Sequence, residues 1–94
     1  MQENDKKAFR FKVTGRVQGV AYRYYAQKKA NELGVNGWIR NLSDGSVEGV
    51  VEGEEDAAIG FITWCKEGPR MAIVESIDIE PIEVEGFTEF SIKS

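Results

Sequence analysis

Residues 9–34 read FRFKVTGRVQGVAYRYYAQKKANELG, and this segment decides the fold. Its beginning alternates apolar and polar side chains, which predicts a half-buried strand over residues 9–14. A loop over residues 15–21 follows. Apolar and small side chains then recur at helical spacing and Gly34 supplies a C-terminal cap, so we expect a helix over residues 22–33.

A hairpin and a second helix follow. Residues 38–42 and the alternating residues 47–52 predict two strands, and the turn residues 42–45 join them. Acidic residues 54–56 favour a helix start because negative charge interacts well with the helix dipole. Gly68-Pro69 ends that helix. Its apolar stripe consists of Ala58, Phe61, Ile62 and Cys65.

The last third of the chain predicts two more strands. Apolar residues mark a long strand over residues 77–84, in which Pro81 indicates an edge position or a bulge. Phe90 and Ile92 mark a short final strand. The element order β-α-β-β-α-β predicts an α+β, ferredoxin-like sandwich. We expect one antiparallel sheet of four main strands plus the short C-terminal strand, with two helices on one face.

Length and composition predict a single globular domain over residues 1–94. The chain is 41% hydrophobic and 30% charged, and its apolar runs are too short to cross a membrane. Its first residues are polar, so we expect residues 1–7 to be a flexible tail and no secretory signal. We expect a monomer.

Cysteine and histidine usage points to a reducing compartment. One cysteine, Cys65, cannot form an internal disulfide, and the absence of histidine argues against a structural zinc site. We therefore expect a cytoplasmic protein with no metal and no cofactor. We also expect Cys65, Trp38 and Trp64 in the core.

Charge is divided unevenly along the chain. The net charge is −4, but residues 1–40 carry a net +6 and residues 41–94 a net −10. Such asymmetry indicates an anion-binding region or simply a solvated acidic surface. Charge alone does not separate the two.

The loop before the first helix has the composition of a phosphate cradle. The first N–H groups of a helix lack internal partners, and Ser, Thr, Asp or Asn usually caps them. No such residue precedes this helix, and Gly19 allows close approach of the backbone to a ligand. Arg23 adds a guanidinium suited to two phosphate oxygens. An ordinary glycine turn followed by a surface arginine would look the same in sequence.

Strand geometry brings a second residue to this loop. The strand after the first helix runs parallel to the first strand, so its end returns to the edge where the helix begins. Asn41 ends that strand, so we expect it at the same rim as Arg23. Its amide could hold a water for attack on phosphorus, or could merely satisfy the following turn.

Two stretches together resemble the acylphosphatase family. Residues 15–23, GRVQGVAYR, are similar to the first signature of that family. Residues 37–41, GWIRN, followed by Gly45-Ser46-Val47 and then Gly53, are similar to the second. Both occur in the expected order and spacing, and the resemblance covers essentially the whole domain.

The resemblance implies an enzyme, a hydrolase of acid anhydrides that converts an acyl phosphate to a carboxylate and inorganic phosphate. It makes Arg23 and Asn41 the catalytic residues, with Arg23 binding substrate and Asn41 orienting water. No metal or organic cofactor is implied. The residues that would bind substrate, through the backbone amides of this stretch, are Gln18, Gly19, Val20, Ala21, Tyr22 and Arg23.

Three positions depart from the family pattern. Ala21 stands where the family commonly has glycine, Tyr22 where phenylalanine is frequent, and Ile39 where a smaller residue is usual. These departures concern the local shape of the loop.

The main alternative is a non-catalytic phosphate- or RNA-binding ferredoxin-like module. RNA recognition on this fold needs aromatic residues on the central strands. Residues 47–52 contain none and carry two carboxylates, so we expect a small acyl phosphate as the partner and no nucleic acid. A metal chaperone would need a Cys-x-x-Cys loop, and residues 18–21 contain no thiol. A non-catalytic domain of a carbamoyl-transfer system is expected in much longer chains.

Overall fold

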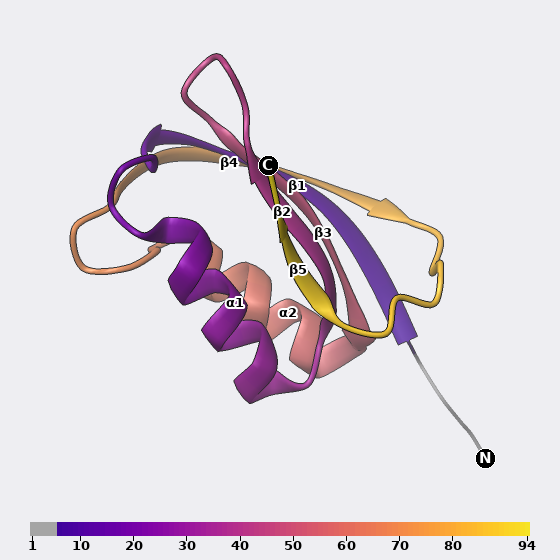
Figure 1. Ribbon diagram of the computed structural model, residues 1–94. Coiled ribbons are helices and arrows are strands. Elements are labelled where there is room, and N and C mark those ends of the chain that lie inside the picture. Colours follow the sequence, from indigo (N-terminus) through magenta and orange to yellow (C-terminus); the bar gives the residue numbers. More distant parts are fainter. Residues whose placement is uncertain (1–5) are drawn as a thin grey trace.

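The computed structural model describes residues 6–94 and contains five strands and two helices (Figure 1). The predicted tail over residues 1–7 falls partly outside this range, and Lys6 and Lys7 are the first residues of a strand. The elements are β1 (Lys6–Arg16), α1 (Tyr22–Leu33), β2 (Asn36–Asn41), β3 (Val47–Glu54), α2 (Glu55–Cys65), β4 (Ile73–Ile82) and β5 (Phe90–Lys93).

The strands form one sheet in the order β4-β1-β3-β2-β5, and both helices lie on one face of it (Figure 1). The first four strands in this sheet pair antiparallel, which confirms the predicted ferredoxin-like arrangement. The fifth strand differs from the expected antiparallel sheet, because β5 pairs parallel to β2. The sheet is therefore mixed. The chain between β4 and β5 crosses from one edge of the sheet to the other, which fixes the direction of β5.

Strand β4 is an edge strand, as Pro81 predicted. It begins at Ile73, earlier than the apolar pattern indicated, and ends at Ile82 rather than residue 84. The register between β1 and β4 shifts between Thr14 and Gly15. Proline lacks an amide hydrogen, so an edge position accommodates it without loss of a ladder bond.

The core lies between the helices and the sheet. The faces predicted to be apolar meet there, and Phe11 packs edge to face on Phe61 with ring centroids 5.7 Å apart. Cys65 is fully buried, as expected. Gly34 ends α1 in the left-handed conformation, and its N–H donates to the carbonyl of Ala30. The periodicity in the sequence therefore located both helices correctly.

The central strand β3 is buried on both faces, although its sequence alternates. Glu52 is only 4% exposed, and its carboxylate accepts hydrogen bonds from the backbone N–H groups of Glu85, Gly86 and Phe87. These bonds hold the crossing segment between β4 and β5 against the sheet. A buried carboxylate with three donors is well satisfied.

The same face carries a second acidic residue, Glu48, which pairs with two arginines on neighbouring strands. Arg40 donates two hydrogen bonds to its Oε1, and Arg10 donates one to its Oε2 at 3.1 Å. Burial alone would raise the pKa of Glu48, but the hydrogen bonds from Arg40 and Arg10 outweigh it and hold that pKa below its usual value.

The expectation that both tryptophans lie in the core is wrong for Trp38. Trp38 is half-buried on the sheet face opposite the helices, with Arg40 and Lys93 over its ring. Alternation places it there, because its neighbour Ile39 faces the core. Trp64 is partly buried and packs against the core.

Neither helix of the described chain, residues 6–94, has the length and apolar character of a membrane span.

Candidate active site

The loop over residues 17–21 joins β1 to α1, and the helix starts without a side-chain cap. Ala21 occupies the N-cap position and makes no side-chain hydrogen bond to the helix. No acidic residue lies in the first turn of α1. The start of α1 therefore has no capping side chain and no carboxylate in its first turn, which agrees with the predicted anion-binding start.

Two residues of this loop adopt the left-handed conformation. Gly19 has φ 75°, which glycine adopts at little expense. Ala21 has φ 62° and is the one non-glycine residue with positive φ among residues 6–94. The position at which the family commonly has glycine is thus one that requires a left-handed backbone. Alanine there stores roughly 1 kcal/mol of backbone strain.

A cavity of about 230 Å³ lies against this loop, and it contains both residues predicted to be catalytic. Arg23 lines it from the first turn of α1 and Asn41 from the end of β2. Strand geometry predicted this meeting. The residues that line the cavity are Val17, Gln18, Gly19, Ala21, Tyr22, Arg23, Tyr24, Asn41 and Ile92.

Asn41, which lines this cavity, has an unsatisfied side-chain acceptor. Its Oδ1 is buried and has no hydrogen-bond partner. Buried polar atoms nearly always have a partner, so an unpaired one beside a cavity indicates a group that binds there. The turn after β2 is closed by other groups, since the N–H of Leu42 donates to Ser46 O and that of Gly45 donates to Leu42 O. The Oδ1 of Asn41 therefore makes no hydrogen bond to this turn.

Arg23 is half-exposed, and its guanidinium reaches the C-terminal strand. Its Nη1 donates to the carbonyl oxygen of Lys93 at 3.3 Å. This contact leaves the other guanidinium donors available and sets the direction of the side chain. A cation in the first helical turn is unfavourable for the dipole, and a bound anion would reverse that effect.

The side chain of Gln18 makes two hydrogen bonds outside the loop. Its Nε2 donates to the carbonyl oxygens of Leu42 and Ser46, each at 2.8 Å. The side chain thus ties the loop to the turn that follows Asn41. The amide of Gln18 positions the site.

The side chains of Val20 and Tyr22 pack against the core, so the expected binding role falls to their backbone N–H groups. Val20 is absent from the cavity wall and packs partly against the core. Tyr22 is 1% exposed, and its hydroxyl donates to Cys65 O at 2.7 Å. Burial, and then the charge of Cys65, raise the pKa of Tyr22 well above its usual value. These two residues can offer an anion only their backbone.

Three residues of the cavity wall were not among the predicted site residues. Val17 packs inward and is 1% exposed. Tyr24 directly follows Arg23 on the helix. This adjacency was the signal in the sequence that could have placed Tyr24 at the site. Ile92 comes from β5, which pairs beside β2, and nothing in the sequence indicated that pairing.

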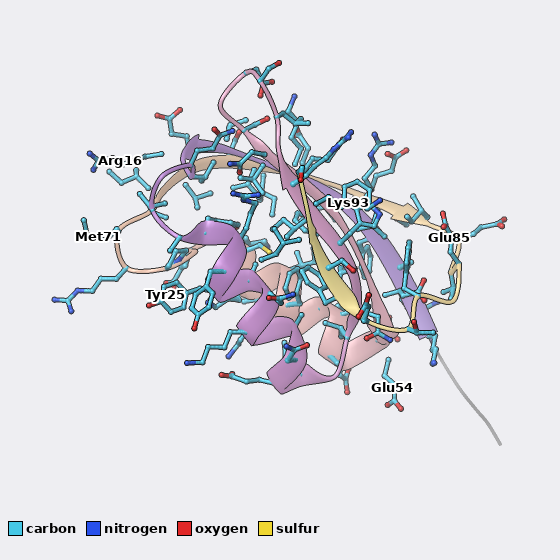
Figure 2. All side chains as sticks on the ribbon, in the orientation of Figure 1. Arg16, Tyr25, Glu54, Met71, Glu85 and Lys93 are labelled. Atoms are coloured by element: carbon cyan, nitrogen blue, oxygen red, sulfur yellow. The ribbon has the colours of Figure 1, made fainter. Side chains whose placement is uncertain are left out.

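The other basic residues of this end have partners or point away. Lys12 pairs with Asp44 at 3.2 Å. Hydrogen bonds from Ser46, with a smaller contribution from Lys12, lower the pKa of Asp44 to about 2. Arg16 is exposed and points outward at the end of the molecule that carries the loop (Figure 2).

Comparison with known proteins identifies one family. The acylphosphatase family model matches residues 9–92. An acylphosphatase of Nocardioides sp. is 48% identical over 81 residues, which cover 86% of this chain and 82% of the relative. An acylphosphatase of Methylococcus capsulatus is 49% identical over 81 residues, covering 85% of this chain and 88% of the relative.

A solved structure agrees with the sequence relatives. The structure of an acylphosphatase from Coxiella burnetii superposes with a TM-score of 0.91 at 39% identity, and the match covers 95% of this chain and 94% of that one.

Proposed function

Because the chain belongs to the acylphosphatase family, we propose that Arg23 and Asn41 are the residues with which it hydrolyses acyl phosphates. The reaction itself, conversion of an acyl phosphate to a carboxylate and inorganic phosphate, follows from the family. The observation that carries the residue assignment is that Asn41, whose Oδ1 is buried and unpaired, lines the same cavity as Arg23.

The phosphoryl group binds at the start of α1. The uncapped N–H groups of the loop and first turn point their partial positive charge at it, and Arg23 adds a full charge. Val20 and Tyr22 contribute only their backbone N–H groups. Gly19, with an open face, and Ala21, with a small side chain, leave room for the phosphoryl oxygens.

Asn41 holds the attacking water. Its Oδ1 accepts a hydrogen bond from the water, which directs an oxygen lone pair toward phosphorus. The amide stays neutral, so it does not repel the phosphoryl oxygens. Gln18 keeps this amide in register with the loop through the carbonyls of Leu42 and Ser46.

The chemical step forms one bond and breaks one. The water oxygen bonds to phosphorus while the bond between phosphorus and the acyl oxygen breaks, and the carboxylate leaves with that electron pair. The water's proton passes to the released phosphate or to solvent. A carboxylate is a good leaving group, so a strong general base is unnecessary, and the rate comes from positioning and charge stabilisation.

We further propose a cytoplasmic monomer that needs no metal or cofactor and has no nucleic-acid partner. The buried thiol of Cys65 suits a reducing compartment. Carboxylates along the edge strand β4 disfavour pairing with a second copy. Residues 47–52 of the central strand carry no aromatic side chain on which RNA bases could stack. Full activity in excess chelator is the expected result for the metal-free enzyme.

Hydrolysis of acetyl phosphate in heavy-oxygen water tests this mechanism. The label should enter inorganic phosphate, because water attacks phosphorus. Label in the acetate would mean attack at the acyl carbon and would contradict the role of Asn41. Arg23→Ala should weaken both inhibition by inorganic phosphate and turnover, by about 10²–10³ in rate. Arg16→Ala, at an exposed arginine on the same end, is the matched control.

A further inference from the structure

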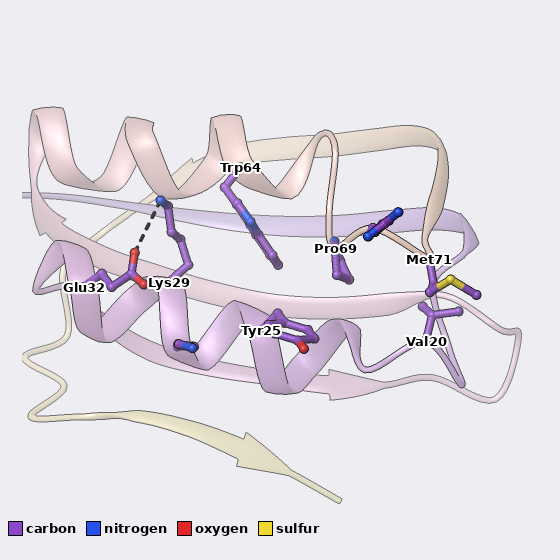
Figure 3. A pocket seen from close by; sticks show the side chains of 9 residues that line it. Val20, Tyr25, Lys29, Glu32, Trp64, Pro69 and Met71 are labelled. Atoms are coloured by element: carbon purple, nitrogen blue, oxygen red, sulfur yellow. Dashed lines mark ion pairs between the residues drawn. The ribbon is translucent and has the colours of Figure 1, made fainter.

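A groove between the two helices opens beside the catalytic loop. It has a volume of about 550 Å³, which is the size of a small-molecule site. Its walls are mostly apolar or aromatic: Tyr25 comes from α1, Trp64 from α2 and Met71 from the segment before β4 (Figure 3). Met71 is 65% exposed and Tyr25 is 44% exposed, although both are large and apolar. Exposed apolar residues gathered in one groove indicate a binding surface.

Cations surround this groove. Lys28, Lys29 and Arg70 line it, against one carboxylate, Glu32. Lys29 pairs with Glu32 at 3.5 Å (Figure 3). Lys28 and Arg70 therefore give the groove an excess of positive charge. The whole chain has a net charge of −4, so this local excess is opposite to the average. The groove therefore fits a ligand with an apolar body and a negative group.

The catalytic loop separates this groove from the catalytic cavity. Gly19 and Ala21 line the cavity, whereas Val20 between them lines the groove. A side chain added at Gly19 would meet nothing within 4 Å, so the crest of the loop is open. Tyr24 of the cavity and Tyr25 of the groove touch, with ring centroids 5.0 Å apart. A ligand can therefore pass from one hollow to the other over small residues and aromatic rings.

We propose that this groove binds the acyl part of the substrate. The preferred substrates are then acyl phosphates whose acyl chain is apolar and ends in an anionic group. The phosphoryl end occupies the cavity beside Arg23, the chain crosses the loop at Gly19, and the terminal anion meets Lys28 and Arg70. This inference rests on the proposed catalytic site, because the cavity fixes the phosphoryl end.

Three substrates test the proposal. Acetyl phosphate reaches only the cavity. Octanoyl phosphate adds an apolar chain, and suberoyl phosphate has the same chain length with a terminal carboxylate. In the wild type, kcat/KM should be about tenfold higher for suberoyl than for acetyl phosphate, because remote binding energy adds to catalysis. High salt should reduce this preference through screening.

The double variant Lys28→Gln, Arg70→Gln isolates the groove. It should lower kcat/KM for suberoyl phosphate by about threefold to tenfold, because exposed ion pairs are individually weak. Hydrolysis of acetyl and octanoyl phosphate should not change. Lys7→Gln, at the far end of β1, is the matched control and should leave all three substrates unaffected. Met71→Ala should instead reduce activity toward octanoyl and suberoyl phosphate alike.

The possible outcomes distinguish a failure of the groove proposal from a failure of the catalytic assignment. Normal acetyl phosphate turnover with an unchanged ratio of suberoyl to octanoyl phosphate in the double variant would overturn the groove proposal alone. A failure of the catalytic assignment would appear in the Arg23 and Asn41 variants with acetyl phosphate. If free suberate altered acetyl phosphate turnover without competing with the substrate, the groove would be a separate effector site and the proposal would be wrong.

Discussion

The side-chain amide of Gln18 lies 2.8 Å from the carbonyl oxygen of Leu42, the residue directly after Asn41. The same nitrogen donates to Ser46 O at 2.8 Å. The phosphate-binding loop and the strand that carries Asn41 are thus fixed to each other by one side chain. Their relative position does not depend on backbone pairing alone.

Gln18→Ala should therefore loosen the position of the phosphate-binding loop relative to Asn41. We expect kcat to fall by about tenfold to a hundredfold, because small misplacements of reacting groups have large effects on rate. The free energy of unfolding should fall by about 1–2 kcal/mol through the two lost hydrogen bonds. Steady-state kinetics and urea unfolding measure both.

Gln27→Ala is the matched control for that variant. Gln27 also donates an amide hydrogen bond to a backbone carbonyl, that of Phe90 at 2.9 Å, but away from the loop. It should reduce stability by about 1 kcal/mol and leave kcat near the wild-type value. Equal kinetic defects in the two variants would show that Gln18 has no positioning role.

The left-handed backbone at Ala21 predicts that glycine at this position would stabilise the protein. The φ of 62° at Ala21 is strained for alanine, and its side chain is exposed, so Ala21→Gly removes strain without loss of packing. We expect the free energy of unfolding to rise by about 0.5–1 kcal/mol, after the greater entropy of glycine in the unfolded chain is subtracted.

Gly19→Ala is the opposite experiment on the same loop. Gly19 has φ 75° and open space at its Cβ position, so only the backbone opposes the methyl group. It should lose about 1 kcal/mol of stability. Thermal unfolding of both variants should give shifts of opposite sign. Destabilisation by Ala21→Gly would contradict the left-handed geometry of the loop.

Tyr22 and Cys65 join the two helices through a buried hydrogen bond. Tyr22→Phe removes it and leaves the carbonyl of Cys65 unpaired, so stability should fall by about 1 kcal/mol. Burial raises the pKa of the Cys65 thiol to about 12, so in the native state it should resist alkylation. The labelling rate of Cys65 in Tyr22→Phe should rise by roughly fivefold, in step with the population of the open state. An unchanged rate would mean that this bond does not stabilise the packing of the helices.

The lowered pKa of Glu48 predicts that the protein loses stability at acidic pH. The pKa of Glu48 in the folded protein lies below the usual 4.5, because the hydrogen bonds from Arg40 and Arg10 outweigh burial. The stabilisation is therefore complete above pH 4.5 and is lost as the pH falls through the lower, folded-state pKa. Urea unfolding between neutral and acidic pH should show this loss in the wild type.

Glu48→Gln should flatten that dependence. Asp44→Asn is the comparison, since the pKa of Asp44 is about 2 in the folded protein and its loss should extend to lower pH. If the free energy of unfolding of Glu48→Gln depended on pH as strongly as that of the wild type, other carboxylates would be responsible for the loss of stability in acid.

The sequence predicted the helices and the meeting of Arg23 with Asn41 because each follows from local periodicity and strand direction. Helix α1 has the predicted bounds, since the spacing of its apolar residues and Gly34 define both ends. In a β-α-β unit the second strand runs parallel to the first, so the end of β2 had to return to the edge of the sheet where the loop lies.

Other features depend on contacts distant in sequence. The parallel pairing of β5 with β2 is fixed by the crossing segment that Glu52 holds, and no pattern within β5 indicates it. Glu48 and Glu52 alternate as exposed residues do, but distant partners bury them. The position of Trp38 and the direction of the Gln18 side chain likewise depend on tertiary neighbours.

The most direct test of the catalytic account is Asn41→Ala, with both kcat for acetyl phosphate and inhibition by inorganic phosphate measured. The Oδ1 of Asn41 makes no hydrogen bond within the protein, so its removal breaks none. We predict that kcat falls by about 10²–10³ while the inhibition constant of inorganic phosphate stays near the wild-type value. Near-normal kcat, or an equal loss of phosphate binding, would contradict the assignment of Asn41 as the residue that holds the attacking water.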